Sequence, residues 1–165
     1  MSSNIYLKID SIDGESEAKS YEKQIEIFSW SHGFSQPTSS VRASSGATVE
    51  KAHHGDLSVT KNIDSSTDGI LKSIWTGNMI KEVTITCLRS DGNADNAAVA
   101  YLVVKMEQVI ISSYSISGGG GALPAENMTF NYGKVTYTYD PQKKDTGDAG
   151  GKKVISANLV DNTVA

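Results

Sequence analysis

The stretch at residues 25–34, which reads IEIFSWSHGF, decides how the strands of this chain can be arranged. Successive side chains of a strand point to opposite sides, so Ile25 and Ile27 fall on one face of an extended segment. Phe28 and Trp30 fall on the other face. The pattern predicts a strand whose two faces are both covered.

Three polar residues in the same stretch raise the question of catalysis. Ser29, Ser31 and His32 stand together, as a nucleophile and its base would. On a strand, however, Ser31 and His32 project to opposite faces and cannot form a hydrogen bond, and Ser29 shares the face of Ser31. No Gly-x-Ser-x-Gly turn surrounds either serine. These residues therefore favour a structural role, and we expect no enzymatic activity.

Length and composition narrow the class of protein. The 165 residues fit one domain, spanning 1–165, and the hydrophobic fraction of 38% is typical of a globular chain. The formal charge of -4 argues against nucleic acid as a partner, because phosphate contacts need clustered lysine and arginine. The apolar run at 97–104 is too short to cross a bilayer, so we expect no membrane insertion.

Two further features concern the compartment. Cys87 is the one cysteine of the chain and cannot form an internal disulfide, which agrees with synthesis in a reducing cytoplasm. The first residues, MSSN, lack the charged and apolar regions of a cleavable export signal.

Most of the chain follows the period of strands. The expected strands cover residues 5–9, 24–34, 56–63, 80–89, 98–113 and 127–139. Residues 98–113 are apolar at both parities, which predicts burial on two sides. In 127–139 the apolar parity changes at Gly133, where a bulge would redirect the strand. Residues 36–55, rich in serine and glycine, are expected to form a long extended loop.

One segment has a helical period instead. At residues 64–77 an apolar stripe is expected to pack on the core, after capping residues and before a glycine C-cap at Gly77. The stripe consists of Ile70, Leu71, Ile74 and Trp75.

Several short motifs resemble known chemistry but lack its context. Asp145-Thr-Gly matches the aspartic protease triplet, yet lysines precede it where apolar strand residues are needed. Asp91, Asn93 and Asp95 match the opening of a calcium loop, but Asn96 stands where its glycine is needed and Leu102 where its glutamate belongs. Gly118 begins a glycine run that is followed by no phosphate-binding Lys-Ser. We interpret all three as turns or connections.

The best candidate for a metal site is the segment His53-His54-Gly55-Asp56. His54 and Asp56 could face the same way on an extended chain, but His53 would then point elsewhere and His32 would have to be the third ligand. A solvated loop end is the favoured interpretation, and no metal or cofactor is expected.

These observations predict a mainly β protein: a small β-barrel of antiparallel strands, or a sandwich, with one short helix and a long loop. A barrel of this size has one inner core, so strands that are apolar on both faces need further cover. Association of identical subunits through strand edges, closing as a ring, would supply it.

The chain also resembles a known family over about nine tenths of its length. The resemblance is to the haemolysin-coregulated protein (Hcp) family, the inner-tube subunits of the bacterial type VI secretion system. It is carried by strings in a fixed order: IYLKIDSIDGES, IEIFSWSHGFSQ, DLSVTKNIDSSTDGIL, TGN, YLVVKMEQVIISSYSISGG, ENMTFNYGKVTYTYDPQ and GDAGG.

The resemblance implies a hexameric ring with a central channel, stacked into a tube inside a contractile sheath, tipped by a spike trimer and carrying effector proteins. It also implies assembly in the cytoplasm and secretion without a cleavable signal. Ser31, with Ser29, is expected to face the channel. The loop at 36–55 resembles the family's ring-stacking loop, with candidate residues Gln36, Ser45, Lys51, His53 and His54.

Two positions depart from the family. His32 and Ala157 stand where aromatic residues are common, which leaves the first site more polar and the last strand less packed. An alternative is a phage-tail-tube-like or ligand-binding β module outside type VI secretion, because such modules share the architecture.

Overall fold

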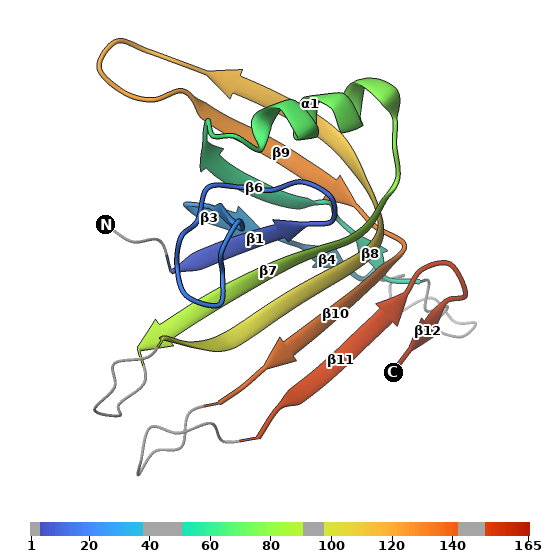
Figure 1. Cartoon of the computed structure of the whole chain (residues 1–165). Coiled ribbons are helices and arrows are strands. Elements are labelled where there is room, and N and C mark those ends of the chain that lie inside the picture. The colour runs from blue at the N-terminus through green and yellow to red at the C-terminus, as the bar shows by residue number, and fades with distance from the viewer. Residues whose placement is uncertain (1–3, 38–50, 91–97, 142–150) are drawn as a thin grey trace, which may run out of the picture.

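The computed structural model describes residues 4–37, 51–90, 98–141 and 151–165. Within these ranges the chain forms antiparallel strands and one short helix, α1 (Thr67–Thr76), as Figure 1 shows. The mainly β class predicted from the sequence is therefore confirmed. Two sheets share one long strand, and the core lies between them.

The first sheet runs in the order β12-β11-β10-β8-β7-β1-β2. Its strands are β12 (Thr163–Val164), β11 (Lys153–Asn158), β10 (Lys134–Tyr139), β8 (Ala98–Ser117), β7 (Ile80–Ser90), β1 (Ile5–Ile9) and β2 (Ile25–Glu26). The two C-terminal strands, β11 and β12, were not among the strands predicted from the periodicity.

The second sheet runs in the order β3-β6-β9-β8. Its further strands are β3 (Ser29–Ser31), β6 (Leu57–Asn62) and β9 (Ala125–Asn131). β8 belongs to both sheets because its first half pairs with β7 and β10 and its second half with β9. The order of the first sheet begins at β12 and ends at β2, so closure into a small barrel is not confirmed.

The predicted strand at 24–34 changes sheet in its middle. The Ile27 amide donates to the Ile5 carbonyl of β1 at 3.2 Å, whereas the next amide, Phe28, donates to Thr60 of β6 at 2.9 Å. After this point the inward parity changes, so Trp30 packs against the same core as Ile27. Phe28 is 59% exposed. The prediction of two covered faces is therefore wrong: one core is contacted from alternate parities.

The same correction applies to β8. Gln108 has a φ of 54°, which places this residue in the left-handed region and inserts an irregularity into the strand. As a result Met106, Val109 and Ile111 all face one core, although their parities differ. For these three residues the change of parity therefore reflects a bulge, and they need no second covering surface.

Gly133 marks the point where the chain passes from β9 to β10, as the sequence predicted. Its amide donates to the carbonyls of Glu107 at 3.0 Å and Gln108 at 3.1 Å. A Cβ atom on Gly133 would lie 2.6 Å from the side-chain oxygen of Gln108, so a larger residue here would have to displace that side chain.

Helix α1 covers one end of the core and contacts β8 (Figure 1). Ile70 is fully buried, Ile74 packs against the core and Leu71 is half-buried. Trp75, however, is 78% exposed, so its predicted place in the core is wrong. The reason is angular: Ile70 and Ile74 share a face at a spacing of four, and the residue after Ile74 has turned away from it. Gly77 ends the helix with the predicted left-handed conformation.

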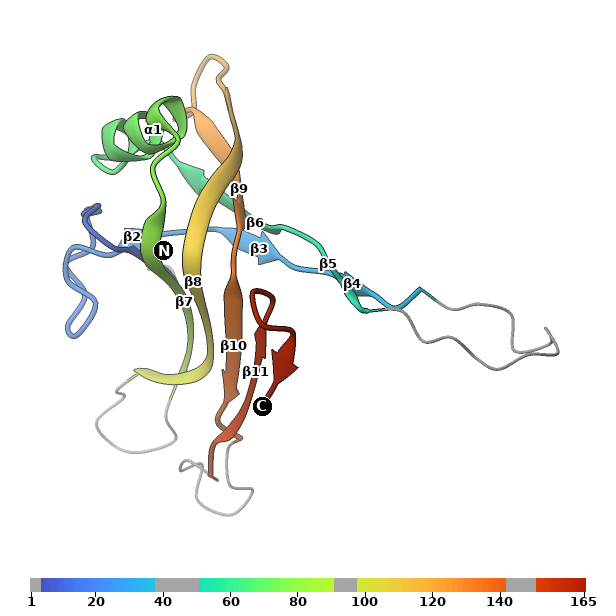
Figure 2. The same ribbon diagram turned by 90° about the vertical axis from the view of Figure 1, so that its right-hand side faces the viewer.

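The stem of the predicted long loop is a short hairpin of β4 (Phe34–Ser35) and β5 (His53–His54). It extends away from the two sheets, as the rotated view in Figure 2 shows. We call β4, β5 and Gly55 the arm base.

Candidate functional site

The outer face of the second sheet carries small polar residues in two rows that cross four strands. The pairing of the strands places each row in register. The first row is Ser29, Thr60, Asn127 and Ser115, and the second is Ser31, Ser58, Thr129 and Ser113. We call these eight residues the polar face.

Hydrogen bonds between neighbouring strands order this surface. Thr60 donates to the Asn127 side chain at 2.7 Å, and the hydroxyls of Ser113 and Thr129 lie 2.6 Å apart. At its border Asp56 accepts from Ser112 at 2.6 Å. None of the eight residues is charged, so the surface is hydrophilic without attracting either sign of charge.

The opposite sides of the same strands are apolar. Leu57 and Val59 of β6, and Met128 and Phe130 of β9, are at most 1% exposed. The strict alternation of small polar and large apolar residues fixes which face meets solvent, because a slip of one residue would bury the hydroxyls. The core therefore holds the polar face in place.

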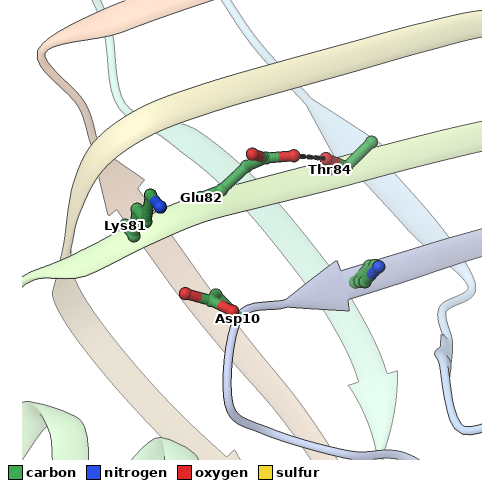
Figure 3. A pocket seen from close by; sticks show the side chains of 5 residues that line it. Asp10, Lys81, Glu82 and Thr84 are labelled. Atoms are coloured by element: carbon green, nitrogen blue, oxygen red, sulfur yellow. Dashed lines mark hydrogen bonds between the residues drawn. The ribbon is translucent and has the colours of Figure 1, made fainter.

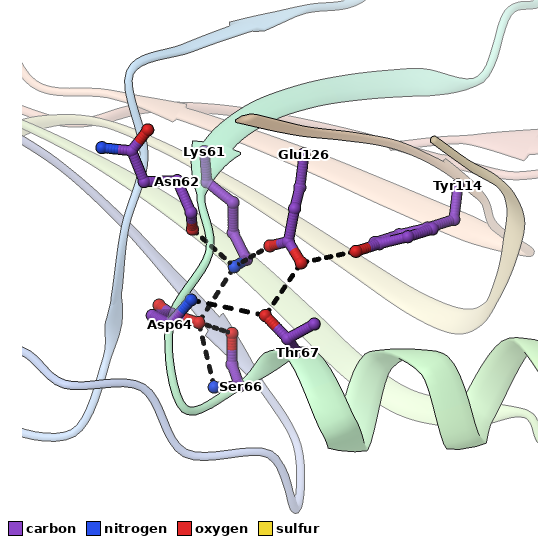
Figure 4. A network of polar contacts seen from close by, with 7 residues as sticks. All are labelled: Lys61, Asn62, Asp64, Ser66, Thr67, Tyr114 and Glu126. Carbon is purple, nitrogen blue, oxygen red and sulfur yellow. Dashed lines mark hydrogen bonds and ion pairs between the residues drawn. The ribbon is translucent and has the colours of Figure 1, made fainter. Parts of the chain in front are cut away.

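One position breaks this alternation. Lys61 continues the inward parity of β6 and its side chain is fully buried. Its ammonium group donates to Glu126, to Asp64 at 2.9 Å and to the Asn62 carbonyl at 2.9 Å (Figure 4). All three of its protons thus have acceptors.

Glu126 is equally buried, on the facing position of β9. Besides Lys61 it accepts from Thr67 at 2.8 Å and from Tyr114 at 2.5 Å. Burial is the main cause that raises the pKa of Tyr114, and the hydrogen bond to Glu126 raises it further. The network joins β6, β8, β9 and the start of α1. Sequence reasoning missed it, although a lysine on the apolar parity of a strand was the available signal.

The polar face ends at two strand edges. Within the described residues β7 pairs with β8 only as far as Val109, so residues 110–117 of β8 are bonded on one side by β9. At the other end, β3 pairs with β6 alone. Exposed apolar residues lie close to both edges, with Phe28 beside β3 and Ile110 on β8.

Some of the residues predicted to stack rings are exposed, whereas one of them contacts the body of the protein. Gln36, Lys51 and His53 are exposed, whereas His54 is half-buried and lies 2.9 Å from the Tyr132 hydroxyl. Ser45 lies outside the described residues. Ser29 and Ser31 are both exposed on the polar face.

An apolar hollow lies beneath the arm base. This hollow of about 400 Å³ is bordered by the rings of Phe34 and Tyr137 and by strands β10 to β12. Ala157, the residue predicted to loosen the last strand, forms part of its wall, with Ile155 beside it. Burial raises the pKa of Tyr137 to about 12.

The candidate sites for metal and catalysis do not gain support. No cluster of histidine, cysteine and carboxylates suited to a metal occurs among the described residues. Asp56 bonds to Ser112 and Asn131, and His54 to Tyr132. The protease-like triplet at Asp145 and the calcium-loop-like segment at 91–95 lie outside the described ranges.

A small hollow on the first sheet, about 160 Å³, is bordered by charges of both signs (Figure 3). Lys8, Asp10, Lys81 and Glu82 surround it, and Thr84 donates to Glu82 at 3.4 Å. Mixed charges on an open sheet surface are typical of a solvated face.

Comparisons with known proteins identify the family. The family model described as "Type VI secretion system effector, Hcp" matches residues 6–139. Protein hcp1 of Pseudomonas aeruginosa is 32% identical over 166 residues and is covered completely, as is this chain. The chain belongs to the Hcp family.

Solved structures agree with this Hcp assignment. A structure described as that of a type six secretion system protein has a TM-score of 0.89 at 28% identity, covering 99% of this chain and 100% of its own. Hcp1 from Salmonella typhimurium has the same fold, with a TM-score of 0.80 at 24% identity and complete coverage of both chains.

As an Hcp protein, this chain is a secreted tube protein of the type VI secretion system. In the residues that the structure describes, no helix is both long and apolar enough to span a membrane.

Proposed function

We propose that this Hcp protein, acting as one domain over residues 1–165, is the building block of a hexameric ring. In the ring the polar face lines a central channel. One observation carries this assignment: eight small uncharged polar residues cross four strands in register, between two strand edges. A channel wall that lets folded protein cargo pass needs a hydrated surface without strong charges or apolar patches.

The two edges explain how the ring closes. β3 of one copy pairs with residues 110–117 of β8 in the next, so the contact is head-to-tail and repeats until it closes. The sheets of neighbouring copies then join into a continuous inner wall, which completes a barrel at the level of the assembly. Phe28 and Ile110, exposed at 59% and 42%, become covered at this contact.

Stacked rings form the tube. The arm base extends from the body of the subunit, and the loop at 36–55 contacts an adjacent ring through residues such as Gln36, Ser45, Lys51 and His53. Assembly takes place in the cytoplasm inside a contractile sheath. A spike trimer tips the tube, and effector proteins travel in its channel. The protein itself has no catalytic role in this proposal.

Electron microscopy of the purified protein tests the ring directly. Rings of uniform diameter with an open centre are expected at neutral pH, and sedimentation should report six copies of the 17.6 kDa chain. A monodisperse monomer at high protein concentration would contradict the proposal.

A further inference from the structure

The arm base is attached to the body by two histidines and two tyrosines in one chain of hydrogen bonds. His32 Nδ1 lies 2.5 Å from the Tyr137 hydroxyl. His32 Nε2 lies 2.7 Å from the Tyr132 hydroxyl and 3.1 Å from the Gly55 carbonyl oxygen. The Tyr132 hydroxyl in turn lies 2.9 Å from His54 Nδ1. These bonds connect the arm base to β10 and to the end of β9.

The partners fix where the protons lie. A carbonyl oxygen only accepts, so His32 Nε2 carries a proton and points it toward Gly55 and Tyr132. In the neutral ring His32 Nδ1 is then bare and accepts from Tyr137. Since Tyr132 accepts from His32, its own proton is free to go to His54 Nδ1. Every donor and acceptor in this series of hydrogen bonds therefore has a partner when both histidines are neutral.

Aromatic rings enclose the two imidazoles. Phe34 of the arm base lies 4.3 Å from His32 and 5.0 Å from His54, centroid to centroid. Tyr137 stacks on His32 at 5.9 Å, with the planes 9° apart. An added proton would therefore be placed among rings and hydroxyls that are partly shielded from water.

Among the described residues, few charged groups face the two histidines. Burial lowers the pKa of His32, and the His54 charge lowers it further, while Gly55 and Asp56 act in the opposite direction. Burial and the neighbouring His53 lower the pKa of His54. Asp56 is exposed and is already hydrogen-bonded to Ser112 and Asn131. On the sides of β10 and β9 the facing titratable groups are Tyr137 and Tyr132.

We propose that His32, His54, Tyr132 and Tyr137 form a pH-sensitive clasp, which holds the arm base against the body at neutral pH and releases it in mild acid. A proton on His54 Nδ1 removes the acceptor of Tyr132, and a proton on His32 Nδ1 removes the acceptor of Tyr137. Each step leaves a hydroxyl donor, the buried Tyr132 or the half-buried Tyr137, without its partner and adds a positive charge. Two such steps act on one short hairpin.

The consequence for the tube rests on the proposed function. If the loop at 36–55 contacts the next ring, then releasing its base weakens stacking without separating the subunits of one ring. Tubes would hold together in a neutral cytoplasm and come apart into rings in an acidic compartment. The clasp itself is a property of one subunit and can be tested without reference to rings.

Hydrogen exchange at the arm base is the direct test. The Gly55 amide donates to the Gly33 carbonyl at 2.9 Å, so its exchange reports opening of the arm base. The full chain is measured by mass spectrometry at pH 7.5 and 5.5, with times scaled for the intrinsic pH dependence of exchange. Peptides from β1 and β7 serve as internal reference. We expect the protection of Gly55 to fall by more than about twofold between the two pH values, because protonation of either histidine removes an acceptor of the clasp.

Variants separate the clasp from general acid effects. His32→Gln/His54→Asn keeps polar groups at both positions but removes both titrations, so its protection should change less than about twofold. His53→Gln removes the exposed histidine of the same strand but keeps both clasp histidines, so its protection should still fall between the two pH values. An unchanged Gly55 amide in the original chain, or an equal response in the double variant, would overturn the clasp.

A second measurement covers the case in which the double variant loosens the arm base at every pH. The pKa values of His32 and His54 are then read from their ring carbons by NMR in the unaltered chain. Values below the ordinary 6.5 for both support the clasp, and ordinary values refute it. Rings in micrographs at pH 7.5 report separately on the proposed function.

Discussion

Lys61 and Glu126 form an ion pair that is wholly removed from solvent, across the facing positions of β6 and β9. Each partner is fully satisfied by further groups: Lys61 by Asp64 and the Asn62 carbonyl, Glu126 by Thr67 and Tyr114. Because the members come from β6, β8, β9, the start of α1 and the turn before it, the pair fixes the start of α1 against the sheet behind the polar face.

Removing one partner of this pair should be strongly destabilising. Glu126→Ala leaves the buried ammonium of Lys61 with Asp64 as its remaining carboxylate, and a loss of about 3–5 kcal/mol in unfolding free energy is expected. Urea titration measures it. Glu82→Ala, which breaks a 3.7 Å ion pair between exposed groups, is the control and should cost no more than about 1 kcal/mol. Equal losses in the two variants would mean that the buried pair is not special.

Helix α1 offers a matched pair of substitutions. Ile70 is fully buried and Trp75 is 78% exposed, on the same helix. Ile70→Ala should lower the unfolding free energy by about 2–5 kcal/mol, whereas Trp75→Ala should change it by about 0.5 kcal/mol or less. Thermal unfolding of both variants checks this, and a larger loss for Trp75→Ala would place that side chain in a contact within the subunit.

Much of the fold follows from the sequence because parity and period are local properties. The expected strand at residues 5–9, the helix with its glycine C-cap and the switch at Gly133 are all present. The errors arose where the backbone changes its relation to the core without a change in composition. The chain passes between sheets at Ile27 and Phe28, and Gln108 is left-handed. No glycine or proline stands at either place, so the sequence does not indicate these changes.

Only part of the candidate site could be predicted from the sequence. Ser29 and Ser31 could be placed on an exposed face, but the other six residues of the polar face belong to strands whose register the sequence does not specify. The clasp depends on contacts between His32 and Tyr137, which are 105 residues apart. Such long-range pairs are set by strand order, and local periodicity carries no information about it.

The head-to-tail contact predicts a variant that separates subunits and leaves their fold intact. Phe28 is exposed beside the β3 edge, so Phe28→Asp places a charge in the proposed contact at little cost to the isolated subunit. Rings should be lost in micrographs while circular dichroism stays unchanged. Asn127→Asp, a charge of the same sign on the interior strand β9, should keep its rings. Intact rings with Phe28→Asp would exclude this edge from the interface.

Stability should fall in mild acid because of the two half-buried histidines. Folding lowers the pKa of both His32 and His54, so the unfolded chain takes up protons more readily. The stability that they contribute is complete above the unfolded pKa of about 6.5 and is lost as the pH falls through the folded pKa values. Between pH 7.5 and 5.5 the thermal midpoint should drop more for the original chain than for His32→Gln/His54→Asn. Parallel drops would assign the acid sensitivity to other groups.

The loop at 36–55 should govern stacking more than it governs ring formation. Lys51 is exposed, so Lys51→Glu leaves the subunit fold undisturbed while it takes the formal charge of the chain from -4 to -6. A matched control is Lys19→Glu, an equal charge change at an exposed position outside the loop at 36–55. Rings of both variants should form normally in micrographs at neutral pH, and only Lys51→Glu should give fewer and shorter tubes. Added salt should partly restore its tubes by screening the new repulsion. If both variants lose tubes equally, net charge rather than the loop controls stacking, and the assignment of the loop fails.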